Sequence, residues 1–119
     1  MDKTFPELIS QLPAADIPIP GVKSFLAQAA NQQFVFMSFD RDVEVPEHAH
    51  AAQWGVVLDG EIELTIEGIK RVLKKGDSYV IPNGVRHSAR IRSGYKDLTL
   101  FDEKDRYKVK ATTCPRLEV

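Results

Sequence analysis

The chain has 119 residues, of which 43% are hydrophobic and 28% charged, and its 16 Lys and Arg nearly balance its 17 Asp and Glu. This length predicts one domain with its own hydrophobic core, and the lack of a basic stripe argues against nucleic-acid binding. The single cysteine cannot form an internal disulfide, and the sequence shows neither a leader-like N-terminus nor a membrane-length apolar run, so we expect a cytoplasmic protein without membrane contact.

Residues 1–21 are expected to form an N-terminal arm. Residues 5–12 can form a short helix, but the prolines at positions 13, 18 and 20 prevent its continuation and favour an extended stretch. Strands are predicted next, at 22–28 and 34–40. The segment 34–39 is apolar on both of its alternating faces, so its outer side needs cover from a second subunit or from the arm. We therefore expect a symmetric homodimer.

Short segments separated by turn residues make up the rest of the chain. Asp59-Gly60 predicts a two-residue hairpin between strands at 53–58 and 61–66, because both residues tolerate positive φ. Glu67-Gly68 predicts a second hairpin, and further strands are expected at 69–74, 78–81, 85–92 and 97–102. Strands at this spacing predict an all-β antiparallel sandwich or barrel over residues 22–110, followed by a C-terminal tail at 111–119.

All three histidines of the chain fall in two short segments. His48 and His50 are one residue apart, so on a strand both rings would point to the same face. His87 follows the turn Pro82-Asn83-Gly84, which can bring a new strand beside that pair. A lone histidine is more often a hydrogen-bonded core residue, but three in this arrangement favour a site for one divalent metal ion.

Gln53 is the candidate for a fourth ligand. An unbroken strand after His50 would point Gln53 to the opposite face, so its participation requires an irregular backbone at Ala51-Ala52. An amide oxygen is neutral, so the ion would keep its full charge and could act as a Lewis acid on a substrate oxygen or on bound water. We also expect at least one open coordination position facing a cavity, whereas a closed site would favour a structural role.

For several other side chains a structural role is the simpler explanation. Trp54 could line a pocket, but a core or interface position is favoured. Arg90 and Arg92 have the opposite parity to His87 and are expected on an exposed basic face. Cys114 has no histidine left to activate it as a nucleophile. The candidate pocket walls, for which core packing is the favoured alternative, are Met37, Phe39 and Tyr79.

Two segments of the chain resemble the conserved motifs of the small single-domain cupins. The second motif of that family is matched in spacing at four positions, here Gly76, Pro82, Gly84 and His87, while Ile91 replaces its final asparagine. The first motif is matched by His48, His50 and Gly60. Gln53 stands in place of its glutamate, and Asp42 stands in place of its leading glycine.

The resemblance implies a double-stranded β-helix, the jelly-roll barrel of the cupins. It also implies one divalent ion (Zn, Ni, Fe or Mn) held by His48, His50, Gln53 and His87. A small-molecule ligand would be the natural partner of such a site.

Three functions remain open, because cupins carry out many different reactions. The first is a metal-dependent enzyme, such as an isomerase, that acts on a small polar, sugar-derived or carbonyl-containing molecule. The glutamine resembles that of small cupins which help convert unsaturated uronates to their linear keto form, with Asp102 and Arg106 as nearby polar candidates. The second is a non-haem iron dioxygenase. The third is a non-catalytic module in which the metal fixes a ligand or braces the barrel.

Overall fold

The computed structural model describes residues 4–110, which form one short helix and nine strands. The helix, α1, spans Glu7–Ser10. The strands are β1 (Val22–Gln28), β2 (Gln33–Phe39), β3 (Val43–His48), β4 (Gln53–Asp59), β5 (Glu61–Ile66), β6 (Ile69–Lys74), β7 (Ser78–Ile81), β8 (His87–Ile91) and β9 (Lys96–Phe101). Among these residues, no helix is long and apolar enough to cross a membrane. Cys114 and the expected tail at 111–119 lie outside the described residues.

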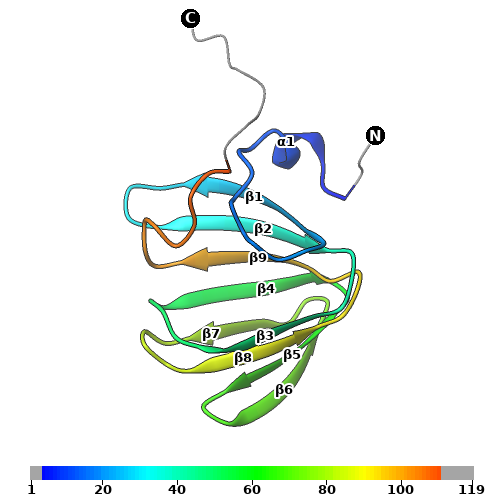
Figure 1. Cartoon of the computed structure of the whole chain (residues 1–119), viewed down its shortest axis with the longest axis vertical. Coiled ribbons are helices and arrows are strands. Elements are labelled where there is room, and N and C mark those ends of the chain that lie inside the picture. The colour runs from blue at the N-terminus through cyan, green and yellow to red at the C-terminus, as the bar shows by residue number, and fades with distance from the viewer. Residues whose placement is uncertain (1–3, 111–119) are drawn as a thin grey trace, which may run out of the picture.

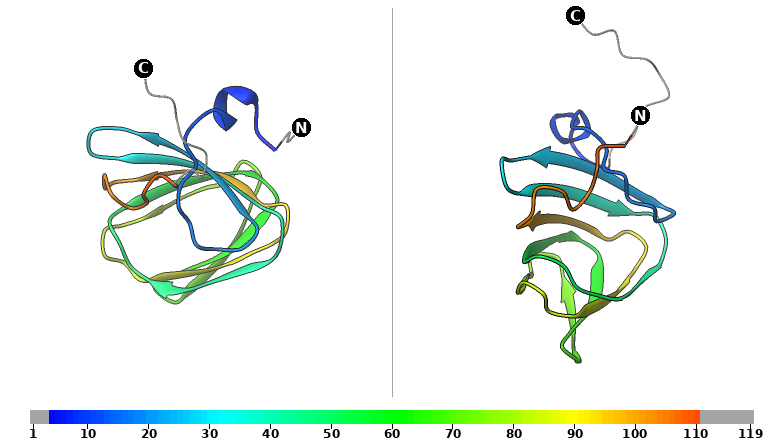
Figure 2. Two further views of the ribbon diagram at one scale, coloured as in Figure 1. Left: turned by 45° about the horizontal axis from the view of Figure 1, so that its top comes forward. Right: turned by 60° about the vertical axis from the view of Figure 1, so that its left-hand side comes forward.

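The strands form two antiparallel sheets that face each other (Figure 1; Figure 2). The larger sheet has five strands in the order β1-β2-β9-β4-β7, and the smaller has four in the order β3-β8-β5-β6. Strands distant in sequence are therefore neighbours in space, as in a jelly roll. The predicted all-β jelly-roll fold is confirmed.

Alternating side chains of the two sheets meet in a core between them. The larger sheet contributes Val35, Met37 and Phe39 from β2, and the smaller contributes Ile62 and Leu64 from β5. Full burial of one such side chain stabilises a fold by about 1.5–3 kcal/mol. Hydrophobic contact between these side chains therefore holds the two sheets together.

In β9 the side chains that point into the core include polar ones, whereas its leucines point outward. Asp97, Thr99 and Phe101 are buried, whereas Leu98 and Leu100 are only partly buried on the opposite face. Placing a carboxyl group inside a barrel is unfavourable unless it has hydrogen-bond partners. The inner face of β9 is thus a polar patch within an otherwise apolar interior.

The outer face of the five-stranded sheet is apolar across several strands. Phe34 on β2, Trp54 on β4 and Val80 on β7 are exposed by 37%, 39% and 62%. In register, Leu100 lies between Phe34 and Trp54, and Trp54 lies opposite Val80, so the four form one continuous patch. Trp54 is therefore not a core residue of this chain.

The N-terminal arm covers only part of this outer face. The ring of Phe5 packs edge-on against Phe25 and Phe36, with centroid separations of 6.0 and 5.9 Å. The arm then pairs with the segment that follows β9, where Ala15 forms a β-bridge with Val109. The patch around Trp54 remains exposed in the described chain.

The connection at Asp59-Gly60 is not the predicted hairpin. β4 pairs with β7 and β9, whereas β5 pairs with β6 and β8, so the chain crosses here from one sheet to the other. Only Gly60 has a positive φ, of 73°. At Glu67-Gly68 both φ angles are positive, 49° and 79°, and the predicted hairpin is present.

Several element bounds differ from the predicted ones. The helix is shorter than 5–12 because Pro6 begins it, with its carbonyl oxygen accepting from the amides of Ile9 and Ser10. Strands β2 and β9 each begin and end one residue earlier than predicted. Strand β8 begins only at His87, because Val85 still belongs to the preceding turn and its amide donates to Pro82 O at 3.2 Å.

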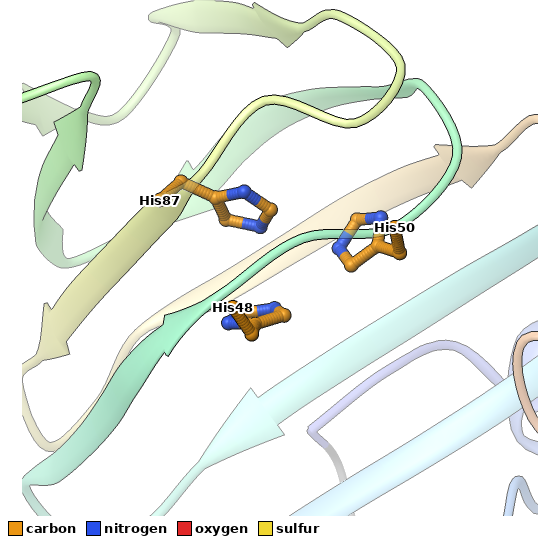
Figure 3. Close-up of side chains that lie close together, drawn as sticks. All are labelled: His48, His50 and His87. Atoms are coloured by element: carbon orange, nitrogen blue, oxygen red, sulfur yellow. The ribbon is translucent and has the colours of Figure 1, made fainter.

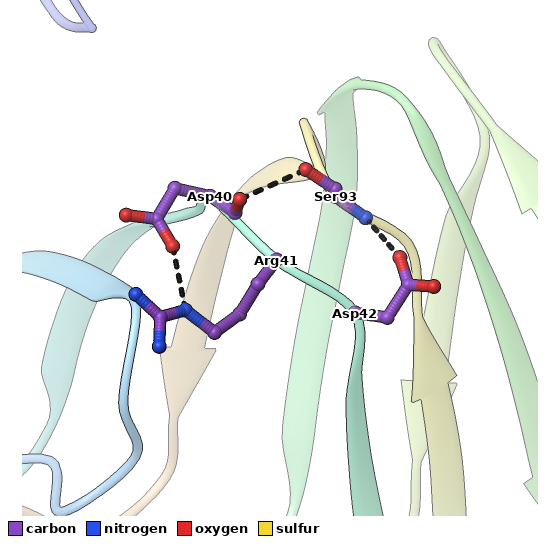
Figure 4. A network of polar contacts seen from close by, with 4 residues as sticks. All are labelled: Asp40, Arg41, Asp42 and Ser93. Carbon is purple, nitrogen blue, oxygen red and sulfur yellow. Dashed lines mark hydrogen bonds and ion pairs between the residues drawn. The ribbon is translucent and has the colours of Figure 1, made fainter.

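A polar network joins the loop before β3 to the loop after β8 (Figure 4). These loops lie at the opposite ends of β3 and β8 from the histidines. The hydroxyl group of Ser93 donates to Asp40 O at 2.9 Å, and the amide of Ser93 donates to Asp42 Oδ1 at 2.8 Å. Arg41 forms an ion pair with Asp40 at 2.9 Å. These bonds fix the connection from β2 to β3 against the loop from β8 to β9.

Candidate metal centre

Three histidine side chains converge where β3 ends and β8 begins (Figure 3). His48 is the last residue of β3 and lies opposite His87, the first residue of β8. Ligand atoms from the three rings all lie within 4.8 Å of one another. The predicted convergence is confirmed, but His50 does not share a strand with His48, because it lies in the connection from β3 to β4.

Backbone hydrogen bonds orient all three rings in the same way. Nδ1 of His48 lies 2.9 Å from Pro46 O, and Nδ1 of His87 lies 2.9 Å from Val85 O. Nδ1 of His50 lies 2.7 Å from Ala51 O. A carbonyl oxygen only accepts hydrogen bonds, so each Nδ1 must carry the proton. Each Nε2 therefore keeps its lone pair, which is the arrangement found at histidine metal ligands.

Burial lowers the pKa of both His50 and His87 below the usual 6.5. In each case the backbone hydrogen bond opposes this effect, while the nearby guanidinium of Arg106 and the neighbouring imidazoles add to it. A lowered pKa keeps both rings neutral near pH 7. The neutral ring is the form that binds a metal ion, so the electrostatics suit the geometry.

Gln53 begins β4 in the opposite sheet and lines the same cavity as the three histidines. Ala51 and Ala52 belong to no strand, so the predicted irregular backbone is present. Its cause is the crossing of the chain between sheets rather than a bulge within one strand. The amide Nε2 of Gln53 donates to the Tyr79 hydroxyl at 3.2 Å.

A cavity of about 140 Å³ adjoins the histidines in the barrel interior. Most of its wall is apolar, and the candidate wall residues Met37, Phe39 and Tyr79 all contribute to it while also being buried core residues. The other polar groups in the wall come from β9 and the segment after it, namely Asp97, Arg106 and Tyr107.

Arg106 lies in the cavity wall without an anionic partner among residues 4–110. Its guanidinium carbon stands 5.6 Å from the centre of the Phe101 ring and 4.6 Å from that of Tyr107. Its Nε is buried and has no hydrogen-bond partner among the described residues. Gln33 fixes this segment, because its side chain donates to Tyr107 O at 2.8 Å and accepts from the Tyr107 amide at 3.0 Å.

Other candidates from the sequence lie away from the cavity. Asp102 is exposed and accepts from Gln32 at 3.2 Å. Arg90 and Arg92 are exposed as expected, but their face is not basic: Arg90 pairs with Glu44 at 3.3 Å and Arg92 approaches Asp42 at 4.0 Å.

Asp97 and Tyr107 were missed by the sequence analysis. Asp97 and Thr99 occupy alternate positions of β9, so they share one face of the strand. Assigning Leu98 and Leu100 to the outer face would have placed this polar pair inside the barrel. Tyr107 lies beyond the last strand, where periodicity gives no information.

The fold and the site together define a class, the small jelly-roll barrels with a histidine cluster able to hold one metal ion. The family model described as the cupin domain matches residues 35–102. This match covers more than half of the chain, so the chain belongs to the cupin family. No curated protein sequence matches it significantly.

Three solved structures illustrate the similarity. An RmlC-like cupin from Shewanella frigidimarina is 26% identical with a TM-score of 0.69, over 81% of this chain and 87% of that one. KdgF from a Halomonas species is 27% identical with a TM-score of 0.66, over 76% and 87% of the two chains. A cupin superfamily protein from Desulfitobacterium hafniense, 22% identical with a TM-score of 0.65 over 74% and 83%, shows the fold alone.

Proposed function

We propose that the protein binds one divalent metal ion, Zn, Ni, Fe or Mn, through His48, His50, His87 and Gln53. The observation that carries this proposal is the common orientation of the three rings, each with Nδ1 bonded to a backbone carbonyl and Nε2 left free. Gln53 is the only further side chain of the first cupin motif that lines the same cavity. When bound, the ion would supply Lewis acidity toward an oxygen of the ligand.

The site keeps room for a ligand. Three imidazoles and one amide leave at least one position open on an ion that takes five or six ligands. The adjoining cavity of about 140 Å³ can hold only a small molecule or one end of a larger one. These features favour a ligand-binding or catalytic ion over one that only braces the barrel.

Arg106 supports a more specific ligand class. It is a half-buried cation that forms no ion pair among residues 4–110, and its buried Nε has no hydrogen-bond partner there; its charge acts on both His50 and His87. A carboxylate accepts two parallel hydrogen bonds from a guanidinium group. We propose a small sugar-derived or carbonyl-containing carboxylate, whose carboxylate binds Arg106 and whose carbonyl or hydroxyl oxygen faces the metal position.

This function can be tested by calorimetric titration of metal-loaded protein with uronates and 2-keto acids. We expect at least one of them to bind, and Arg106→Ala to weaken that binding about tenfold or more, since a hydrogen bond to a charged group contributes roughly 1.5–3 kcal/mol. Arg90→Ala is the matched control, because Arg90 is an exposed arginine paired with Glu44. Binding that is unchanged in Arg106→Ala would contradict the carboxylate assignment.

We further propose that two copies of the chain pair through the outer face of the five-stranded sheet. Single exposed apolar side chains are common on protein surfaces, but the exposed side chains around Trp54 form a contiguous patch. Contiguous apolar surface of this kind is typical of protein interfaces. Light scattering should give twice the chain mass, and Val80→Asp should shift it toward the monomer. Val72→Asp, at an exposed valine on β6 of the other sheet, should not. A monomeric wild-type protein at micromolar concentration would rule out this dimer.

A further inference from the structure

A line of buried polar side chains leads from Gln53 into the core. Tyr79 from β7, Tyr95 from the turn before β9, and Asp97 from β9 are each exposed by 5% or less. None of the three belongs to the cupin motifs matched by this sequence. Buried polar groups are retained where they are hydrogen-bonded, so the partners of each group matter.

Two hydrogen bonds mark the ends of this line. Gln53 Nε2 donates to Tyr79 Oη at 3.2 Å, and Tyr95 Oη donates to Asp97 Oδ2 at 2.9 Å. The hydroxyl groups of Tyr79 and Tyr95 interact with each other and join the two bonds.

The hydrogen bond from Tyr95 to Asp97 Oδ2 sets the direction of the other bonds in this line. Each tyrosine hydroxyl has one proton to donate. The proton of Tyr95 is used on Asp97, so Tyr95 can only accept from Tyr79. The Tyr79 hydroxyl then directs its own proton toward Tyr95, and its oxygen accepts from Gln53 Nε2 at 3.2 Å. The NH₂ end of the Gln53 amide therefore faces Tyr79, and its oxygen faces away from Tyr79.

Gly55 makes this arrangement possible. It lies opposite Tyr79 in the register of β4 and β7. A Cβ atom at Gly55 would overlap the ring and the hydroxyl group of Tyr79. The missing side chain lets Tyr79 cross over β4 and place its hydroxyl beside Gln53. Close approach of this kind is one of the established uses of glycine within a strand.

We propose that Asp97, Tyr95 and Tyr79 form a polarised hydrogen-bond chain that fixes the Gln53 amide with Oε1 directed to the metal. Tyr79 is the positioning residue, because it alone of the three contacts the amide. This inference rests on the proposed metal site and deepens it. A glutamine can present either end of its amide to a cation, and only the oxygen end binds one. These hydrogen bonds hold the Gln53 amide with its oxygen toward the metal position before a metal ion binds.

The test is a titration of metal-free protein with Co²⁺, read by affinity and by the visible absorption of the bound ion. We expect Tyr79→Phe to weaken Co²⁺ binding about tenfold, the lower end of the range for residues that orient a metal ligand. Gln53→Ala should weaken it to a similar extent. The double variant should be no weaker than either single one, because both changes remove the same oriented ligand.

Ser24→Ala is the matched control. It removes a buried hydroxyl that donates to Ala15 O at 3.1 Å on β1, outside the chain of bonds, and should leave Co²⁺ affinity unchanged. Unchanged affinity in Tyr79→Phe, or effects of the two changes that add in the double variant, would overturn the proposal. Loss of binding in His87→Ala without any effect of Gln53→Ala would overturn it too, while leaving the three-histidine site intact.

A measurement on the wild-type protein covers the case in which Tyr79→Phe does not fold. In metal-free protein the side-chain NH₂ of Gln53 should give nuclear magnetic resonance signals with slowed hydrogen exchange, because one of its protons is bonded to a buried hydroxyl. Exchange as fast as that of the exposed Gln11 amide, which is bonded only to Glu7 on the surface, would overturn the proposal.

Discussion

Replacing His87 with alanine is expected to abolish stoichiometric metal binding. His87 is 4% exposed and is the candidate ligand on β8, so among the described residues its loss leaves only His48, His50 and Gln53 as candidate ligands. Because even residues that merely orient ligands contribute 10–100-fold to metal affinity, we expect a loss of at least about 100-fold. Elemental analysis of purified protein and calorimetric titration with Zn²⁺ would measure it.

Arg86→Ala is the control for this experiment. Arg86 is the neighbour of His87 but is exposed and paired with Glu47 at 3.0 Å, so its replacement should leave metal content unchanged. Thermal unfolding provides a second readout. A bound metal stabilises the folded state by mass action, so added Zn²⁺ should raise the melting temperature of wild-type protein but not of His87→Ala. A full metal equivalent retained by His87→Ala would contradict the site.

The second large effect concerns pH and the buried carboxyl of Asp97. Burial raises its pKa from 3.8 to about 7, an effect that the Tyr95 hydroxyl only partly offsets. The folded state therefore holds this proton more tightly than the unfolded state. Its contribution to stability is present below pH 4 and is lost as the pH rises to 7. A pKa difference of this size corresponds to roughly 4 kcal/mol.

Asp97→Asn should remove the decrease in stability that ionisation of Asp97 causes. An asparagine keeps an acceptor oxygen for Tyr95 but has no charge to bury. Urea unfolding of metal-free protein should show the variant gaining stability relative to wild type by an amount that grows from pH 5 to pH 7 and then levels off. Asp105→Asn, at an exposed position, serves as the control and should give a pH-independent difference. A constant difference for Asp97→Asn as well would show that Asp97 ionises normally.

The histidine cluster could be predicted because its information is local. His48 and His50 are separated only by Ala49, and the turn before His87 marks where the chain returns. The eight predicted strands lie within two residues of their observed bounds for the same reason, since alternation and turn residues act over a few positions. Strand β3 (Val43–His48) was not predicted. The connection at Asp59-Gly60 could not be predicted in this way. A hairpin and a crossing between sheets use similar turn residues and differ only in which distant strands pair with the two flanking strands.

The polar parts of the cavity could not be read from the sequence. Asp97 and Thr99 look like the outer face of a strand whose inner face is Leu98 and Leu100. Only the apolar outer surface of the larger sheet reverses that assignment. Arg106 lies in a segment without periodicity, and its place in the wall depends on the bonds between Gln33 and Tyr107. Such placements follow from tertiary contacts that no local pattern encodes.

The four candidate ligands come from both layers of the barrel, since His48 and His87 belong to the smaller sheet and Gln53 to the larger. An ion held by all of them would act as a cross-link between the sheets. The remote end of β3 and β8 is already tied by Ser93 to Asp40 and Asp42. Loss of the ion would then loosen the sandwich at one end only, so that local opening begins beside the cavity rather than throughout the fold.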